Sequence, residues 1–311
     1  MFSLILQSAD NIKLKLSEDF FKEEVRNDYT VSPEMKKVWA VELDLLDQLD
    51  RVCQKYDIPW YLSGGSLLGA VRHQGYIPWD DDIDLMMYRK DFERLCEVAS
   101  QEFTEPYFFQ TEETDTGSIR GHAQLRNSAT TAILKSEEYF HYQFNQGIFI
   151  DIFPLDNVPD DPEERQAFVK SVNQLKHRAR QFYNYCNGYP NKNLSGLKQF
   201  LLYTKFFFEK KKSGGRNIYY DRFAKEITKY DDQATQEVMM VMLGTEKCCW
   251  KREYVANPVR VPFEMLSVPI PKDYDPLLTK QYGKWNIFVR GGSIHGSVIF
   301  DPDKSYKEYL K

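Results

Sequence analysis

Carboxylate side chains that could hold a metal ion lie in the segment from Trp60 to Met87 of this 311-residue chain. Asp82 and Asp84 are two residues apart where an apolar run begins, and the alternation of a strand would place both on one face. Two such carboxylates repel each other unless a cation lies between them. Hard oxygen ligands suit Mg²⁺ or Mn²⁺, which take their other ligands from water and substrate phosphates. The pair therefore predicts a metal site for phosphate chemistry, against the alternative of a solvated acidic turn.

A glycine-rich turn precedes the aspartates by fewer than twenty residues. Gly64, Gly65 and Ser66 stand just before a helix-like apolar stretch. Residues without a Cβ allow the backbone N–H groups of a helix N-terminus to approach a phosphate, and the Ser66 hydroxyl adds a donor. Glycine pairs before helices are often plain turns. The nearby aspartates favour a phosphate-binding turn here.

Two basic residues after the glycine-rich turn are candidates for neutralising phosphate charge. Arg72 follows the short helix, and its planar guanidinium either grips donor phosphates or pairs with the neighbouring aspartates. His73 contacts phosphate or braces the loop.

A third carboxylate, Asp151, stands in the apolar stretch from Gly147 to Leu155. A carboxylate is costly to bury without a charged partner, so Asp151 should face one. We expect it to serve as a metal ligand or as a general base toward an acceptor hydroxyl. The alternative is a structural aspartate that caps the following loop, the role that we predict for Asp156.

Hydrophobic periodicity predicts the elements that must position these residues. Apolar residues at helical spacing indicate a helix from Ser32 to Tyr56 with Ser32 as its cap. The helix over 197–212 is apolar with a basic end; we expect a core helix with a solvated terminus, and the alternative is peripheral contact with a membrane surface. Further helices are predicted at 88–100, 163–185 and 217–229, and strands at 61–62, 107–110, 119–126 and 130–134.

Composition narrows the class of protein. The net charge is −5 with both signs interspersed, which argues against a nucleic-acid partner. Five cysteines, an odd number without metal-ligand spacing, argue against a disulfide framework. The first residues lack the basic region and cleavage site of a signal peptide, and no apolar run approaches the ~18 residues that cross a bilayer. We therefore expect a cytoplasmic location, with the inner face of the membrane as the candidate site of peripheral contact.

Four stretches resemble the LicD family, which includes phosphorylcholine transferases and the fukutin-like proteins. HAQLRNSATTAI, from His122 to Ile133, is similar to a family stretch in which a cation precedes a Thr-containing strand. This resemblance makes Arg126 a second candidate for neutralising charge at the phosphates, with a surface position as the alternative. GGSLLGAVRHQGYIPWDDDIDLM, from Gly64 to Met86, is similar to the central motif of the family. The stretch IFIDIFPLD around Asp151 and PIPKDYDPLLTKQYGKW near the C-terminus are similar to later motifs. Arg290 and His295 fit the closing pattern loosely, and the loop 286–296 departs from it, so neither residue is assigned a role.

The resemblance implies an α+β fold, with a nucleotidyltransferase-like mixed β-sheet core flanked by helices. We expect a single domain over residues 1–311. In it, 32–158 form the catalytic core, 159–248 form a helical insertion with acceptor specificity, and 249–311 form a small C-terminal α/β part. Gly65 and Ser66 would take the phosphate-binding role of the family, and Asp82 with Asp84 the metal-binding role.

The same resemblance implies a reaction. We expect Mg²⁺-dependent transfer of a substituted phosphate, such as phosphocholine, ribitol phosphate or glycerol phosphate, from a CDP-activated alcohol. The acceptor would be a hydroxyl of a glycan or lipid-linked glycan, as in lipopolysaccharide, teichoic-acid or capsule precursors, and CMP would be released. The alternatives are a nucleotidyltransferase that transfers NMP, a glycosyltransferase that uses a sugar nucleotide, and a non-catalytic nucleotide-binding scaffold. The sequence specifies neither the alcohol, nor the acceptor, nor the oligomeric state.

Overall fold

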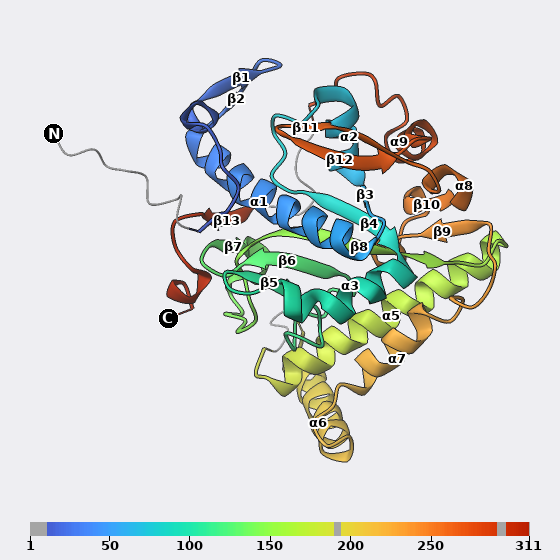
Figure 1. Ribbon diagram of the computed structural model, residues 1–311. Helices are drawn as coiled ribbons and strands as arrows, with labels where there is room; N and C mark the ends of the chain where they lie inside the picture. Colours follow the sequence, from blue (N-terminus) through green and yellow to red (C-terminus); the bar gives the residue numbers. More distant parts are fainter. Residues whose placement is uncertain (1–10, 190–193, 291–296, 311) are drawn as a thin grey trace.

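A mixed β-sheet runs through the protein, and helices flank it (Figure 1). The computed structural model describes residues 11–189, 194–290 and 297–310. Its α+β architecture confirms the predicted fold class. Within the described ranges, no helix combines the length and apolar composition needed to cross a membrane.

The central sheet has seven strands and is organised around β8 (Ile148–Asn157). β8 runs parallel to β4 and antiparallel to β6 and β9. The region 159–248 was predicted to be helical, but it also contains β9, which pairs with β8 and so extends the sheet. The other strands of the sheet are β3 (Tyr61–Leu62), β4 (Asp84–Tyr88), β5 (Tyr107–Gln110), β6 (Ala123–Asn127), β9 (Glu237–Met239) and β10 (Cys249–Lys251).

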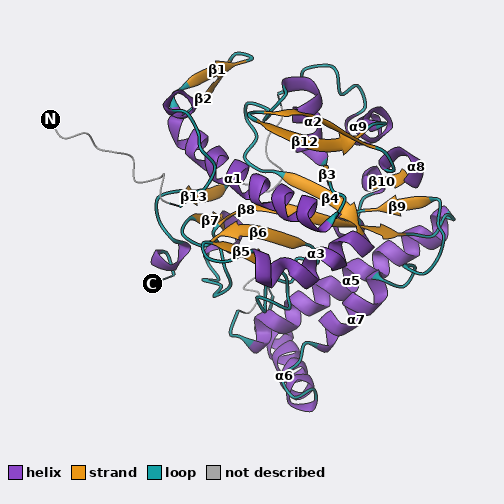
Figure 2. Ribbon diagram, in the orientation of Figure 1, coloured by secondary structure: helices purple, strands orange, loops and turns teal. Residues whose placement is uncertain are grey.

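Smaller pairs of strands and the helices complete the fold (Figure 2). The strand pairs are β1 (Glu24–Arg26) with β2 (Tyr29–Val31), β7 (Thr131–Leu134) with β13 (Val298–Asp301), and β11 (Pro258–Phe263) with β12 (Leu266–Pro271). The α-helices are α1 (Pro33–Tyr56), α2 (Gly64–His73), α3 (Arg89–Glu102), α4 (Lys135–Glu138), α5 (Pro162–Cys186), α6 (Gly196–Lys212), α7 (Ile218–Ile227), α8 (Arg252–Val255) and α9 (Tyr274–Tyr282). Short 3-10 helices lie at Glu18–Phe21, Val241–Leu243, Glu246–Cys248 and Tyr306–Glu308.

The long helix α1 forms as its sequence predicts and crosses the sheet at β8 and β6 (Figure 1). The Ser32 hydroxyl accepts a hydrogen bond from the Met35 N–H, which satisfies one of the free donors of the first turn. The helix ends where Asp57 adopts a left-handed conformation. Its inward side places Trp39 and Leu46 in the core without solvent contact.

Two predicted strand boundaries were wrong. The strand at the acidic run begins at Asp84, so Asp82 lies in the preceding loop and the two carboxylates do not share one strand face. The strand predicted from residue 119 begins only at Ala123, because Ile119 and Gly121 have positive φ angles that extended backbone cannot adopt.

The prediction that α6 is a core helix was also wrong. Phe206 is the only residue of this helix that is buried. Most of its other large apolar side chains are exposed, and the helix projects from the lower end of the molecule in Figure 1. The apolar composition therefore does not reflect a place in the core.

We predict that Ser32→Ala lowers the free energy of unfolding by about 1 kcal/mol, because the first turn of α1 loses its capping acceptor. Urea denaturation would measure the change. Ser17→Ala is the matched control, since Ser17 precedes a 3-10 helix without a side-chain capping bond. Equal stability losses in the two variants would contradict the capping role.

Candidate active site

Aspartates from a loop and two adjacent strands gather at one edge of the sheet. Asp84 and Asp151 are register partners on the parallel strands β4 and β8, so their side chains leave the same face of strands roughly 4.8 Å apart. In the loop before β4, the carboxylates of Asp80, Asp81 and Asp82 have oxygen atoms within 4.8 Å of one another. The fold thus pairs Asp84 with Asp151, and the charges of Asp82 and Asp80 from the loop act on Asp84.

The electrostatics of this group fit a bound divalent cation. Burial, followed by the charges of Asp82, Asp151 and Asp80, raises the pKa of Asp84 well above its ordinary value. The Oδ1 atom of Asp84 is buried and has no hydrogen-bond partner among the described residues. A buried acceptor surrounded by like charges is unfavourable unless a cation compensates it. Mg²⁺ or Mn²⁺ would meet this need with the oxygen ligands that these ions prefer.

Asp151 differs from Asp84 because the protein itself supplies its partners. Its Oδ1 atom lies 3.0 Å from His122 Nε2 and accepts a 2.7 Å hydrogen bond from the Gln124 amide. Burial acts to raise the pKa of Asp151, but the His122 and Gln124 interactions outweigh it and hold this pKa below its ordinary value. Asp156 is fully buried, and its Oδ1 atom accepts a 2.7 Å hydrogen bond from Arg89 Nε. This pairing gives Asp156 a structural role.

His122 contacts Asp151 through Nε2 and is itself largely buried. Burial lowers the pKa of His122, and the nearby charges of Arg120 and Lys176 lower it further, against the opposing effect of Asp151. The imidazole ring packs 4.4 Å from the ring of Phe153, measured between centroids. The His122 contact favours the ionised form of Asp151.

Arg126 reaches the site only through another side chain. Its guanidinium is buried and hydrogen-bonds to Gln124 Oε1, and the amide of Gln124 donates to Asp151. It also donates to Gln110 Oε1 at 2.7 Å and to the Gly147 carbonyl at 2.6 Å. Arg126 therefore orients Gln124, and direct contact with a phosphate stays a prediction.

The glycine-rich turn lies against the aspartates, as the sequence pattern suggested it should. The Asp84 N–H donates to Ser66 Oγ at 2.8 Å, and the Ser63 N–H donates to the Asp84 carbonyl at 2.9 Å. A Cβ added to Gly65 would lie 2.7 Å from Asp80 Oδ2, and one on Gly64, whose φ is +55°, would lie 3.0 Å from Asp84 Oδ2. Only glycine allows this approach, so the N-terminus of α2 and the carboxylates form one site.

Arg72 and His73 lie at the other end of α2, roughly 10 Å along the helix axis from Gly65. Arg72 donates to the Trp285 carbonyl at 3.0 Å and to His73 Nε2 at 3.0 Å, and its guanidinium lies 4.7 Å from the ring centroid of Phe288. Burial, with help from the charge of Arg72, lowers the pKa of His73 to about 4, so the imidazole is neutral at physiological pH. These contacts anchor the C-terminal segment, and a role at the phosphates stays a prediction.

Arg290 and His295 of the closing motif were assigned no role, and the structure describes only the first of them. The Arg290 guanidinium lies 4.9 Å from the ring centroid of Tyr29. His295 falls outside the described residues.

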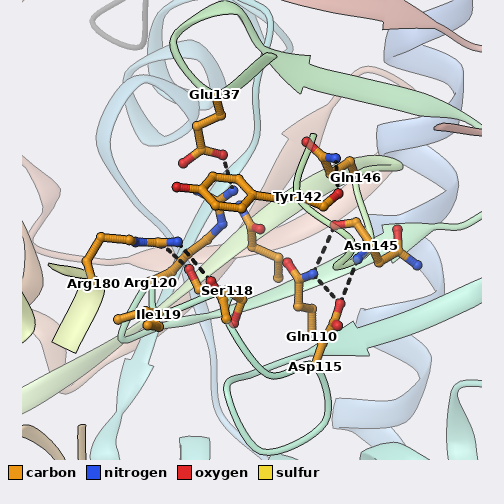
Figure 3. Close-up of polar contacts among 12 residues, drawn as sticks. Gln110, Asp115, Ser118, Ile119, Arg120, Glu137, Tyr142, Asn145, Gln146 and Arg180 are labelled. Carbon is orange, nitrogen blue, oxygen red and sulfur yellow. Dashed lines mark hydrogen bonds and ion pairs between the residues drawn. The ribbon is translucent and has the colours of Figure 1, made fainter. Parts of the chain in front are cut away.

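Arg120, Lys176 and Arg180 form a group of cations near His122, and Figure 3 shows Arg120 and Arg180 with their partners. Arg120 pairs with Glu137 at 3.2 Å, Arg180 donates to the Gly117 and Ser118 carbonyls, and Lys176 donates to the Arg120 carbonyl at 3.2 Å. Burial, followed by the charges of Arg180 and Arg120, lowers the pKa of Lys176 to about 8. Asp151 therefore stands between an acidic region and a basic one.

Several residues at the site were missed by the sequence reasoning. His122 and Gln124 alternate with the strand period that also places Arg126, so period-2 spacing upstream of Arg126 could have identified them. Tyr282 of α9 was not assigned; burial and then the charges of Asp84 and Asp80 raise its pKa. Its proximity depends on how α9 packs, which no local pattern signals.

We predict that Gly65→Ala displaces the Asp80 carboxylate and weakens divalent-metal binding at least tenfold, because the new methyl group would overlap that side chain. Isothermal titration with Mn²⁺ would measure the affinity. Gly196→Ala serves as the control, since a Cβ there meets nothing within 4 Å in the described structure. Unchanged metal affinity in Gly65→Ala would show that the turn does not shape the site.

Comparison with known proteins agrees with this geometry. Residues 57–190 match the family model described as LicD/FKTN/FKRP, nucleotidyltransferase domain. This range contains the glycine turn and every aspartate of the candidate site, from Asp80 to Asp151. The chain is 27% identical over 257 residues, 81% of its length and 91% of the relative, to the lipopolysaccharide cholinephosphotransferase LicD of Haemophilus influenzae.

A shorter match reaches animal proteins. Over 40 residues, 13% of this chain and 8% of the relative, the sequence is 50% identical to the ribitol 5-phosphate transferase FKRP of human and mouse. These matches and the site geometry agree with the resemblance seen in the sequence motifs, and residues 57–190 are similar to the nucleotidyltransferase domain of the LicD/FKTN/FKRP family.

Proposed function

We propose that this protein is a LicD-type phosphotransferase, which moves a substituted phosphate from a CDP-activated alcohol to a glycan hydroxyl. In this reaction the oxygen of the acceptor hydroxyl forms a bond to the phosphorus that carries the alcohol and gives up its proton to water. The bond from that phosphorus to the CMP oxygen breaks, and CMP leaves with the electron pair of that bond. The transferred group is phosphocholine or a similar phospho-alcohol such as ribitol or glycerol phosphate. The acceptor is a lipopolysaccharide, teichoic-acid or capsule precursor at the cytoplasmic face of the membrane. The relatives named for cholinephosphate and ribitol phosphate transfer support this class of reaction.

The observation that carries the proposal is the Asp84–Asp151 pair on adjacent parallel strands, beside the loop aspartates. Asp82, Asp84 and Asp151 would hold Mg²⁺ or Mn²⁺. The ion would supply positive charge that offsets the negative charge of the donor phosphates and of the leaving group. The lowered pKa of Asp151 supports a ligand role over a general-base role, because a weaker base accepts a proton less readily.

The other residues position the reactants in this proposal. The backbone N–H groups at Gly64, Gly65 and Ser66 open α2 and would bind a donor phosphate beside the carboxylates. His122 and Gln124 fix the orientation of the Asp151 carboxylate. Arg126 acts through Gln124, and Arg72 with His73 holds the C-terminal segment. Most of the rate enhancement would then come from positioning and electrostatics.

We predict that one CDP-alcohol stabilises the protein against heat in a Mg²⁺-dependent manner. Thermal unfolding would be measured with CDP-choline, CDP-ribitol, CDP-glycerol, CTP, ATP and a UDP-sugar, each with and without Mg²⁺. The shift should vanish in Asp82→Asn/Asp84→Asn, and turnover with CMP release should fall about a hundredfold or more, because the charge compensation at the phosphates is lost.

The other outcomes of this experiment point to other functions. A preference for CTP or ATP, with pyrophosphate as product, would indicate nucleotidyl transfer. A shift with the UDP-sugar alone would indicate glycosyl transfer. Binding without turnover in the presence of an authentic acceptor would indicate a scaffold.

We predict that Asp84→Asn stabilises the metal-free protein by about 1 kcal/mol above pH 7, because it removes a poorly compensated buried charge. The raised pKa means that the folded protein binds more protons than the unfolded chain above pH 3.8, so wild-type stability falls as pH rises through that range. The Asp84→Asn variant lacks this loss of stability, because its amide does not titrate. The difference in free energy of unfolding between variant and wild type should therefore shrink toward pH 4. Denaturation in EDTA across this pH range would measure it.

Metal should reverse the order of stability. Adding Mg²⁺ would stabilise the wild type by mass action but not Asp84→Asn. Asp232→Asn is the control, because Asp232 is exposed and its substitution should change neither comparison. A variant that is less stable than the wild type in EDTA at pH 8 would contradict the proposed charge imbalance.

A further inference from the structure

The outward face of α6 carries the largest group of exposed apolar side chains in the described part of the chain. Of the fifteen large apolar residues that are exposed there, six belong to this one helix, at 53% to 71% exposure. The stripe is formed by Leu197, Phe200, Leu201, Tyr203, Phe207 and Phe208. Their spacing of three, four and seven residues places most of them along one side of the helix. A continuous apolar face of this kind on a protein surface marks an interaction site.

The opposite face of α6 fixes the helix to the protein. Phe206 has no exposed surface and packs against Phe182, Tyr185 and Tyr219, with ring centroids 5.6 to 6.1 Å apart. The Tyr219 hydroxyl donates to Glu209 at 3.0 Å. Because these contacts hold the inner face of α6 against the protein, its apolar stripe faces away from the molecule. In Figure 1, α6 projects from the lower end of the molecule.

The charges of α6 indicate what covers the stripe. The helix carries five lysines and one glutamate, and that glutamate already accepts from Tyr219. Lys198, Lys205 and Lys212 are spaced by seven residues and follow one border of the stripe, while Lys211 lies near its C-terminal end. A second copy of the chain docked on this face would bring like charges together. A surface with anionic headgroups and an apolar interior complements both the lysines and the aromatic side chains.

We infer that α6 docks this protein on an anionic membrane surface. The helix would lie in the plane of the interface, with Phe200, Leu201 and Phe208 among the acyl chains and the lysine ammonium groups at the lipid phosphates. Its length of roughly 25 Å allows contact along the whole stripe. This surface lies outside the candidate active site, and its existence does not depend on the reaction proposed above.

Vesicle flotation of the full chain tests this inference. We expect binding to vesicles that contain phosphatidylglycerol, weak binding to pure phosphatidylcholine, and release at high salt because screening weakens the lysine contacts. Two α6 variants should each lose at least tenfold in vesicle affinity while keeping the wild-type unfolding temperature, since every substituted side chain is exposed. The variants are Phe200→Ser/Leu201→Ser/Phe208→Ser and Lys198→Gln/Lys211→Gln/Lys212→Gln.

Matched controls replace three exposed apolar residues or three exposed lysines elsewhere on the surface. They should bind vesicles as the wild type does. The controls are Val25→Ser/Leu243→Ser/Met265→Ser and Lys170→Gln/Lys225→Gln/Lys247→Gln.

Three results would overturn the inference. The first is wild-type protein that does not float with anionic vesicles. The second is α6 variants that bind as tightly as their controls. The third is a wild-type dimer, measured by light scattering, that the apolar α6 variant dissociates, because the stripe would then pair two copies of the chain. Donor-induced thermal shifts should be the same in the α6 variants and the wild type, so failure here is distinguishable from failure of the proposed reaction.

Discussion

Repulsion among carboxylates at one edge of the sheet is the constraint on which the site depends. Parallel pairing of β4 and β8 sets Asp84 beside Asp151, and the loop before β4 adds further aspartates. The protein offsets part of this repulsion itself, because His122 and Gln124 contact the Asp151 carboxylate at hydrogen-bond distance and orient it. For Asp84 it provides no equivalent within the described chain, which leaves that position suited to a divalent cation.

The surrounding fold holds the acidic loop in place against that repulsion. Trp39 of α1 donates from its indole nitrogen to the Asp80 carbonyl at 3.0 Å, and its ring stacks on Tyr76 at 4.3 Å between centroids. The Tyr76 hydroxyl donates to the buried Glu42, at 2.9 Å. The glycine turn approaches from the other direction and bonds to β4 through Ser66. Residues far apart in the sequence thus fix a loop that would otherwise separate its charges.

The site and helix α6 use charge in complementary ways. Anionic side chains in the sheet suit a metal-bound phosphate donor, whereas the lysines of α6 suit lipid phosphates. α5 connects the two regions, because Lys176 and Arg180 lie near the site and Phe182 packs against α6. In a protein that acts on lipid-linked acceptors, this arrangement would hold the active site near the membrane.

The sequence by itself predicted several local elements and the acidic character of the candidate site. The Ser32 cap, the helical period of α1 and the glycine turn before the aspartates are local signals, and each was sufficient to predict its element. The partners of Asp151 and the approach of Tyr282 were decided by the tertiary structure, because strand order and helix packing bring together residues that lie far apart in the sequence. The same reason explains α6, whose apolar residues resemble a core helix in the sequence. Whether its apolar residues face the core or the solvent depends on which side of α6 meets α5, and only the folded chain decides that.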